Sequence, residues 1–149
     1  MGGIAEKETL QGRHKMKETI HSFKPGTPFL VDSTSLNRRW ATVFEDDGET
    51  AHFYALDLGE EKHSRNPVQE TLQIYNVATL THADGTFSIS IIWSEDGHKA
   101  CLLINANPHA IFDFEAKRGY CRTRCPPPAK WNAHDFAWDD RAMEFFKNS

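Results

Sequence analysis

The chain has 149 residues and a mass of 17.0 kDa, the size of one ordinary domain. Hydrophobic residues make up 39% of the sequence and charged residues 26%, which excludes wholesale disorder. The formal net charge of −4 argues against a protein that coats nucleic acid. No stretch approaches the roughly 18 consecutive apolar residues of a membrane span.

The start of the chain is polar and lacks the apolar stretch of a secretory leader. We expect a flexible N-terminal extension over residues 1–15, followed by a single domain over 16–149. The three cysteines are an odd number, which without an export sequence indicates reduced thiols. A cytoplasmic location is therefore predicted.

Three Asp-Gly pairs lie between β-rich runs: Asp47-Gly48, Asp84-Gly85 and Asp96-Gly97. Each predicts a tight β-hairpin, because a two-residue turn with positive φ suits Asp followed by Gly. Strands are expected over 39–45, 51–56, 79–83, 86–93, 99–105, 109–115 and 119–124. Hairpins join antiparallel neighbours, so a meandering antiparallel sheet of about six or seven strands is predicted.

Two helices are expected to pack on this sheet. One is predicted over 66–75, where an Asn-Pro start precedes apolar residues at helical spacing, namely Val68, Leu72 and Tyr75. The other begins at Asp139 or Asp140 and runs through Phe146. The predicted fold class is therefore α+β.

Four stretches carry a family resemblance: RWATVFEDDGETAHFYALD (39–57), IYNV (74–77), WSEDGHKACLLINANPHAIFDF (93–114) and RGYCRTRCPPPAKW (118–131). Together they resemble a family of small bacterial proteins classed as a domain of unknown function. The resemblance covers residues from about 28 to about 148. It implies a bacterial cytoplasmic protein, and it provides no active site to carry over.

An acidic hairpin tip is the first candidate site. Glu45, Asp46, Asp47 and Glu49 would repel one another unless water, a cation or a basic partner screened them. We interpret them as a solvated tip, with a partner surface as the alternative. An EF-hand is excluded, because Thr50 stands where that loop requires glycine.

A basic stretch without acidic residues, 117–130, is the second candidate site. In an extended chain Tyr120, Arg122 and Arg124 share one face, and paired guanidinium groups suit a phosphate or carboxylate. Pairing with acidic groups of the same chain is the alternative. The candidate partner- or anion-binding residues are Tyr120, Arg122, Arg124, Lys130, Trp131, His134 and Trp138.

Cys121 and Cys125 have a spacing within the broad zinc range, but no second matched pair accompanies them. Strand periodicity instead directs both thiols towards the core. The sequence contains no nucleophile elbow, HExxH helix, phosphate-binding loop or dinucleotide fingerprint. No catalytic residue, metal site or cofactor is predicted.

These observations favour a protein-binding module that is not an enzyme, immunity- or adaptor-like in role, with complementary charge selecting its partner. The alternative is a protein or enzyme that binds an anion or a nucleotide-like small molecule around Tyr120, Arg122, Arg124 and His134. A homodimer formed along an exposed edge strand is a third hypothesis. Neither nucleic acid nor a membrane is expected as a partner.

Overall fold

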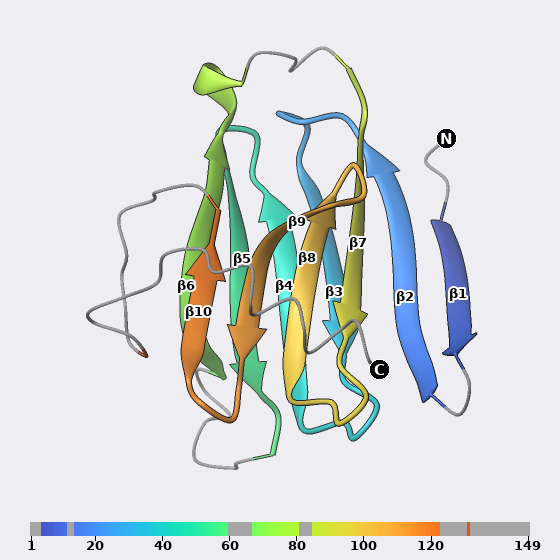
Figure 1. The fold of residues 1–149 in the computed structure, drawn as a ribbon. Helices are drawn as coiled ribbons and strands as arrows, with labels where there is room; N and C mark the ends of the chain where they lie inside the picture. Colours follow the sequence, from blue (N-terminus) through green and yellow to red (C-terminus); the bar gives the residue numbers. More distant parts are fainter. Residues whose placement is uncertain (1–3, 12–13, 60–66, 81–84, 123–130, 132–149) are drawn as a thin grey trace.

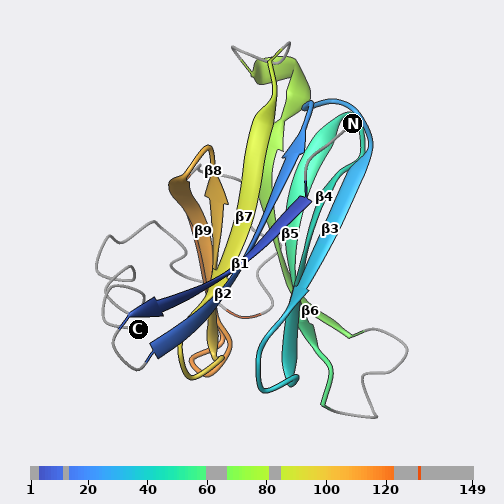
Figure 2. The same cartoon turned by 90° about the vertical axis from the view of Figure 1, so that its right-hand side faces the viewer.

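Two antiparallel β-sheets pack face to face (Figure 1). The computed structural model describes residues 4–11, 14–59, 67–80, 85–122 and 131, with side chains from Ile20 onward. Figure 2 shows the two layers from the side, with β7–β9 in one layer and β3–β6 in the other. This part of the chain is a β-sandwich.

The larger sheet has six strands in the order β1-β2-β7-β8-β9-β10. Its strands are β1 (Ile4–Gln11), β2 (His14–Phe23), β7 (Phe87–Trp93), β8 (Lys99–Ile104), β9 (Asn107–Asp113) and β10 (Arg118–Cys121). The smaller sheet has four strands in chain order: β3 (Phe29–Thr34), β4 (Trp40–Asp46), β5 (Thr50–Asp57) and β6 (Val68–Asn76). A 3₁₀ turn, η2 (Val77–Thr79), follows β6.

The predicted α+β fold class is wrong. Within the described ranges η2 is the only helical element, and the helix expected over 66–75 is replaced by β6. The helix expected near the C-terminus lies outside the described residues. The predicted antiparallel sheet is present, but it is divided into two layers that cover each other.

A buried carboxylate in the inward row of β6 makes its sequence pattern fit a helix as well as a strand. Glu70, Leu72 and Ile74 alternate along one face of β6 and are all buried. A charged residue in the inward row hides the period of two, so that Val68, Leu72 and Tyr75 give an equally regular helical pattern. Pairing with β5 along most of the strand decides between the two patterns.

The inward position of Glu70 is stabilised by backbone donors. Its Oε1 accepts a hydrogen bond from the amide of Thr71 at 3.0 Å, and its Oε2 accepts one from the amide of Trp131 at 2.8 Å. A buried carboxylate requires such partners to offset its lost hydration. Glu70 thereby fixes Trp131 beside the core.

Two of the Asp-Gly hairpins form where they were predicted. Asp47-Gly48 lies between β4 and β5, and Asp96-Gly97 lies between β7 and β8. Only the glycine of each pair has positive φ, 101° at Gly48 and 77° at Gly97, so the expected positive φ at Asp does not occur. Asp84 of the remaining pair lies outside the described residues.

Three strands precede the part of the chain where strands were predicted. Residues 1–15, predicted as a flexible extension, include β1, which pairs with β2 along its whole length. β2 in turn pairs with β7, and β3 pairs with β4. The division into an extension and a single domain stays a prediction.

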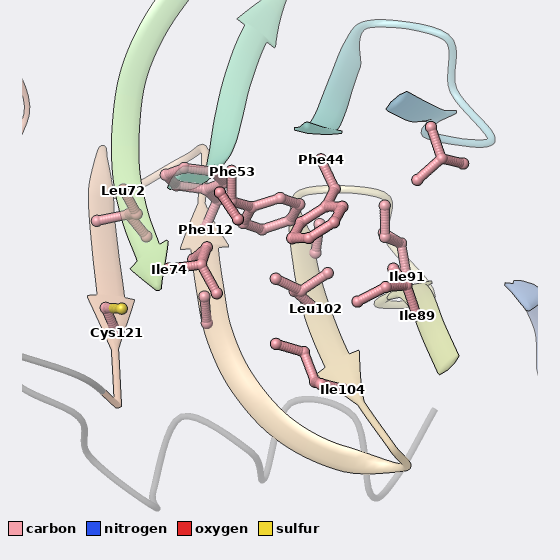
Figure 3. Close-up of a cluster of buried hydrophobic side chains, with 14 of the residues drawn as sticks. Phe44, Phe53, Leu72, Ile74, Ile89, Ile91, Leu102, Ile104, Phe112 and Cys121 are labelled. Atoms are coloured by element: carbon pink, nitrogen blue, oxygen red, sulfur yellow. The ribbon is translucent and has the colours of Figure 1, made fainter. Parts of the chain in front are cut away.

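Aromatic rings fill the space between the sheets (Figure 3). Phe53 of β5 stacks on Phe112 of β9 with ring centroids 4.9 Å apart, so this pair joins the two layers directly. Trp131 meets both Phe112 and Phe114 edge-on, at 5.9 and 5.5 Å. Burial of these rings is the main attraction between the layers.

Side-chain hydrogen bonds also join the two sheets, at a distance from the β4–β5 hairpin turn at Gly48. The indole N–H of Trp93 donates to Oγ of Ser33 at 2.9 Å, and that of Trp40 donates to Nδ1 of His98 at 3.1 Å. Each bond connects an element of the four-stranded sheet with the β7–β8 hairpin. The two layers are therefore fixed by directional bonds as well as by burial.

We expect Phe53→Ala to lower the free energy of unfolding by about 3–5 kcal/mol, because it leaves a cavity where the sheets meet. Urea denaturation followed by circular dichroism measures the effect. Leu58→Ala is the control: its side chain is 48% exposed, so a change within about 0.5 kcal/mol is expected. Equal losses in the two variants would contradict this account of the core.

Candidate partner-binding face

The predicted acidic tip does not form a single solvated cluster. Asp47 and Glu49 are exposed at the turn, whereas Asp46 is fully buried at the end of β4. Glu45 lies on the outer side of the four-stranded sheet, where its Oε1 accepts a hydrogen bond from the hydroxyl of Tyr54 at 3.2 Å. The four carboxylates therefore have different roles.

Asp46 connects three segments. Its Oδ2 accepts hydrogen bonds from the amide of Gly26 at 2.9 Å and from the hydroxyl of Tyr75 at 2.6 Å. Its Oδ1 accepts one from the amide of Gly48 at 2.8 Å. Burial, together with the neighbouring carboxylate of Asp46, raises the pKa of Tyr75, so its hydroxyl remains a donor. Asp46 is thus a structural anchor beneath the turn.

Asp47 stabilises the turn itself. Its Oδ1 accepts hydrogen bonds from the amides of Glu49 and Thr50, both at 2.9 Å. The bonds from Thr50 and Glu49 lower the pKa of the Asp47 carboxyl. The exposed end of the hairpin therefore carries a fixed negative charge at neutral pH.

Strand register arranges the outward side chains of the four-stranded sheet in rows across β3, β4 and β5. From the hairpin end the rows are Leu30–Glu45–His52, Asp32–Val43–Tyr54 and Thr34–Ala41–Leu56. These nine residues are called the β3–β5 face below. Within the described ranges no other element lies across it (Figure 2). Leu30 is 60% exposed, the largest exposed fraction among the large hydrophobic side chains of the described region.

Apolar and acidic groups alternate on the β3–β5 face. Partial burial, and then the neighbouring carboxylate of Glu45, raises the pKa of Tyr54, and Asp47 adds to this effect. The ring of Tyr54 lies 5.9 Å from that of His52. An aromatic ring within a negative field can bind apolar and cationic groups together.

The predicted anion site is only partly within the described residues. Arg124, Lys130, His134 and Trp138 lie outside them. Tyr120 packs against Cys101 and Ile111 on the outer side of the six-stranded sheet. Nε of Arg122 donates to the carbonyl of Pro108 at 2.9 Å. Trp131 contacts the core and does not join these two residues.

The described cysteines are both buried, and strand alternation separates them. Cys121 faces the core, as predicted, and its thiol donates to the carbonyl of Gln73, while Cys101 lies on the opposite side of the sheet. Cys125, whose thiol was also predicted to face the core, lies outside the described residues. Burial raises the pKa of Cys101 to about 12. Burial lowers the pKa of His109, with a hydrogen bond to the backbone of Ile74 acting in the opposite direction. Both side chains are therefore neutral at pH 7.

The described part of the chain contains no group of three or more His, Cys, Asp or Glu side chains placed to hold a metal ion. None of its helices is long and apolar enough to cross a membrane.

Comparison with known proteins places the chain among bacterial sequences. Residues 23–147 match a family described as "Uncharacterized protein conserved in bacteria (DUF2251)". The chain belongs to this family. A relative from Haemophilus influenzae, also named "Uncharacterized protein", is 40% identical over 104 residues. The alignment spans 69% of this chain and 63% of that relative. No solved structure matches.

The family match begins at the last residue of β2 and includes the whole β3–β5 face. Sequence reasoning missed the β3 residues of this face, namely Leu30, Asp32 and Thr34. A pattern was available, because Phe29, Val31 and Ser33 alternate with them and a Pro-Gly pair precedes the strand. The family resemblance inferred from the four motifs is confirmed.

Removing the Tyr75 hydroxyl tests the anchor at Asp46. We expect Tyr75→Phe to lower the free energy of unfolding by about 1.5–3 kcal/mol, because a buried carboxylate loses a donor. Tyr54→Phe removes a longer bond to a partly exposed carboxylate, so a loss below about 1 kcal/mol is expected. Chemical denaturation compares the two variants, and a greater loss in Tyr54→Phe would refute the anchor.

The buried thiol of Cys101 predicts a loss of stability in alkali. Above its ordinary pKa of 9.0 the thiol ionises in the unfolded chain but keeps its proton in the folded one up to about 12. The stabilisation is complete below pH 9.0 and declines as the pH rises to about 12. Between about pH 8 and about pH 10.5 wild type should lose about 2 kcal/mol more than Cys101→Ala in urea titrations. Identical declines would show that the thiol ionises equally in both states.

Proposed function

We propose that this protein is a cytoplasmic binding module that recognises another protein through the β3–β5 face and does not catalyse a reaction. The proposal is carried by exposed Leu30 and partly exposed Val43 and Tyr54, which lie among carboxylates. Contiguous apolar surface that a fold leaves uncovered is typical of interaction sites. Tyrosine is among the residues that contribute most to protein interfaces.

The charge of this face selects a basic partner surface. Asp32 and Glu45 lie in adjacent rows, and Asp47 and Glu49 continue the negative charge onto the hairpin end. The hydrogen bonds to Asp47 keep that carboxyl ionised. Lysine or arginine side chains of a partner would meet these carboxylates, while its apolar side chains would cover Leu30 and Tyr54. Such complementarity increases the rate of association and discriminates against acidic proteins.

A rigid support favours recognition by the folded surface itself. β4 lies between β3 and β5, and its C-terminal end is fixed by the hydrogen bonds of the buried Asp46 side chain. The backbone that carries the face is therefore held in place before a partner arrives. Such preorganisation lowers the entropic cost of binding.

Matched baits test this proposal. Four baits are immobilised and exposed to lysate of the source bacterium: wild type, Tyr54→Ala, Glu45→Lys and Glu115→Lys. The protein that they recover is then purified, and its affinity for each bait is measured by titration calorimetry. We expect one stoichiometric partner with a basic surface, bound at least about ten-fold more weakly by Tyr54→Ala and Glu45→Lys. Glu115→Lys is the control, because it makes the same charge change at an exposed position between β9 and β10.

Salt dependence gives a second criterion. The affinity for wild type should fall as ionic strength rises, and Glu45→Lys should reduce that dependence. Recovery of no partner, or of one that all four baits bind equally, would rule out this face as the binding site. Unfolding of a variant is checked separately by circular dichroism, so that lost binding is attributed to the surface.

A further inference from the structure

The two edges of the four-stranded sheet differ in how their backbone groups are satisfied. Along β6 the carbonyl of Gln73 accepts from the thiol of Cys121 at 3.7 Å, and His109 bonds to the backbone of Ile74. Both contacts come from strands of the other sheet. The β6 edge is thus contacted by β9 and β10 of the six-stranded sheet.

The β3 edge is arranged differently. Among the described strands β3 pairs with β4 alone. The amide of Ser35 donates to the carbonyl of Trp40 at 2.8 Å, which makes Ser35 and Trp40 a hydrogen-bonded pair. Such pairs alternate along antiparallel strands, so Val31 and Ser33 also bond towards β4.

Leu30, Asp32 and Thr34 consequently direct their backbone N–H and C=O groups away from β4. The side chains of the same three residues lie on the β3–β5 face. Leu30 and Asp32 are exposed, and Thr34 is partly exposed. This edge therefore presents a row of backbone donors and acceptors next to an apolar and an acidic side chain, two residues apart.

We propose that β3 accepts an additional β-strand from the partner, with a lysine or arginine beside Asp32 and an apolar residue beside Leu30. This inference rests on the proposed function and specifies how the partner is held. Backbone hydrogen bonds to Leu30, Asp32 and Thr34 would provide affinity, and the alternate side chains would provide selectivity. Neighbouring side chains on adjacent strands lie about 4.5–5.5 Å apart, close enough for opposite charges to attract.

Charge favours a different protein over a second copy of this chain. A symmetric antiparallel pairing of two β3 strands centred on Asp32 would place two carboxylates opposite each other. One centred on Val31 would place Leu30 opposite Asp32. Like charges directly opposite each other destabilise a sheet, and an apolar side chain gives a carboxylate no compensation. A strand with a basic residue beside Asp32 and an apolar residue beside Leu30 satisfies both positions.

Peptide selection tests the inference on the full chain. A random peptide library is displayed on phage and selected against wild type, Asp32→Lys and Glu115→Lys. Wild type and the Glu115→Lys control should enrich peptides in which a basic and an apolar residue stand two positions apart. Asp32→Lys should instead enrich peptides with Asp or Glu at the basic position. Because Asp32 is an exposed side chain, the charge reversal leaves β3–β4 pairing intact.

Amide hydrogen exchange then locates the bound peptide. A synthetic peptide of the enriched sequence, added at saturation, should slow exchange at Leu30, Asp32 and Thr34 at least ten-fold. Exchange at Val31 and Ser33, whose amides already bond to β4, should change much less. No enrichment, an identical enriched pattern with Asp32→Lys, or protection confined to other residues would overturn strand addition at β3.

The outcomes separate this inference from the proposed function. A protein partner that is lost with Tyr54→Ala but kept with Asp32→Lys, without protection of the β3 amides, would support binding to the face and refute strand addition. Dimerisation of wild type through β3, detected by light scattering and abolished by Asp32→Lys, would overturn the assignment of a different protein to this edge. If the face variants and the edge variant all bind as tightly as wild type, both proposals are refuted.

Discussion

The buried carboxylate of Asp46 is the constraint on which the β4–β5 hairpin depends. A charge removed from water requires compensating hydrogen bonds, and here they come from the β2–β3 loop, from the hairpin turn and from β6. The backbone of Gly26 and Gly48 must therefore approach closely. Both glycines have positive φ, a conformation that other residues adopt at a cost. Asp46 thereby fixes the hairpin end of β4, the central strand of the β3–β5 face.

Local chemistry predicted the hairpins but not the layers. Asp47-Gly48 and Asp96-Gly97 specify a reversal within a few residues, so the strands beside them could be inferred directly. β6 depends on pairing with β5 and on donors to Glu70 from a distant residue, Trp131. No short stretch of the sequence includes β6 together with β5 and Trp131. The Asn-Pro start and the spacing of Val68, Leu72 and Tyr75 favoured the helical interpretation, and tertiary contacts decided otherwise.

The candidate site shows the same division. The acidic composition of the tip was evident, whereas the inward direction of Asp46 and the outward direction of Glu45 follow from strand register. Neighbouring residues on a strand face opposite sides, so adjacent carboxylates became one structural and one surface group. Leu30 and Asp32 join Glu45 only because β3 returns alongside β4. The sequence alone could not show which separate strands lie side by side.

The placement of the two described cysteines has a chemical consequence. β9 separates β8 from β10, so Cys101 and Cys121 stand about 10 Å apart across the sheet and point to opposite sides of it. A disulfide needs α-carbons within about 7 Å and converging side chains. Oxidants therefore cannot cross-link this pair without unfolding the strands. A disulfide between Cys101 and Cys121 thus makes no contribution to the stability of the sandwich.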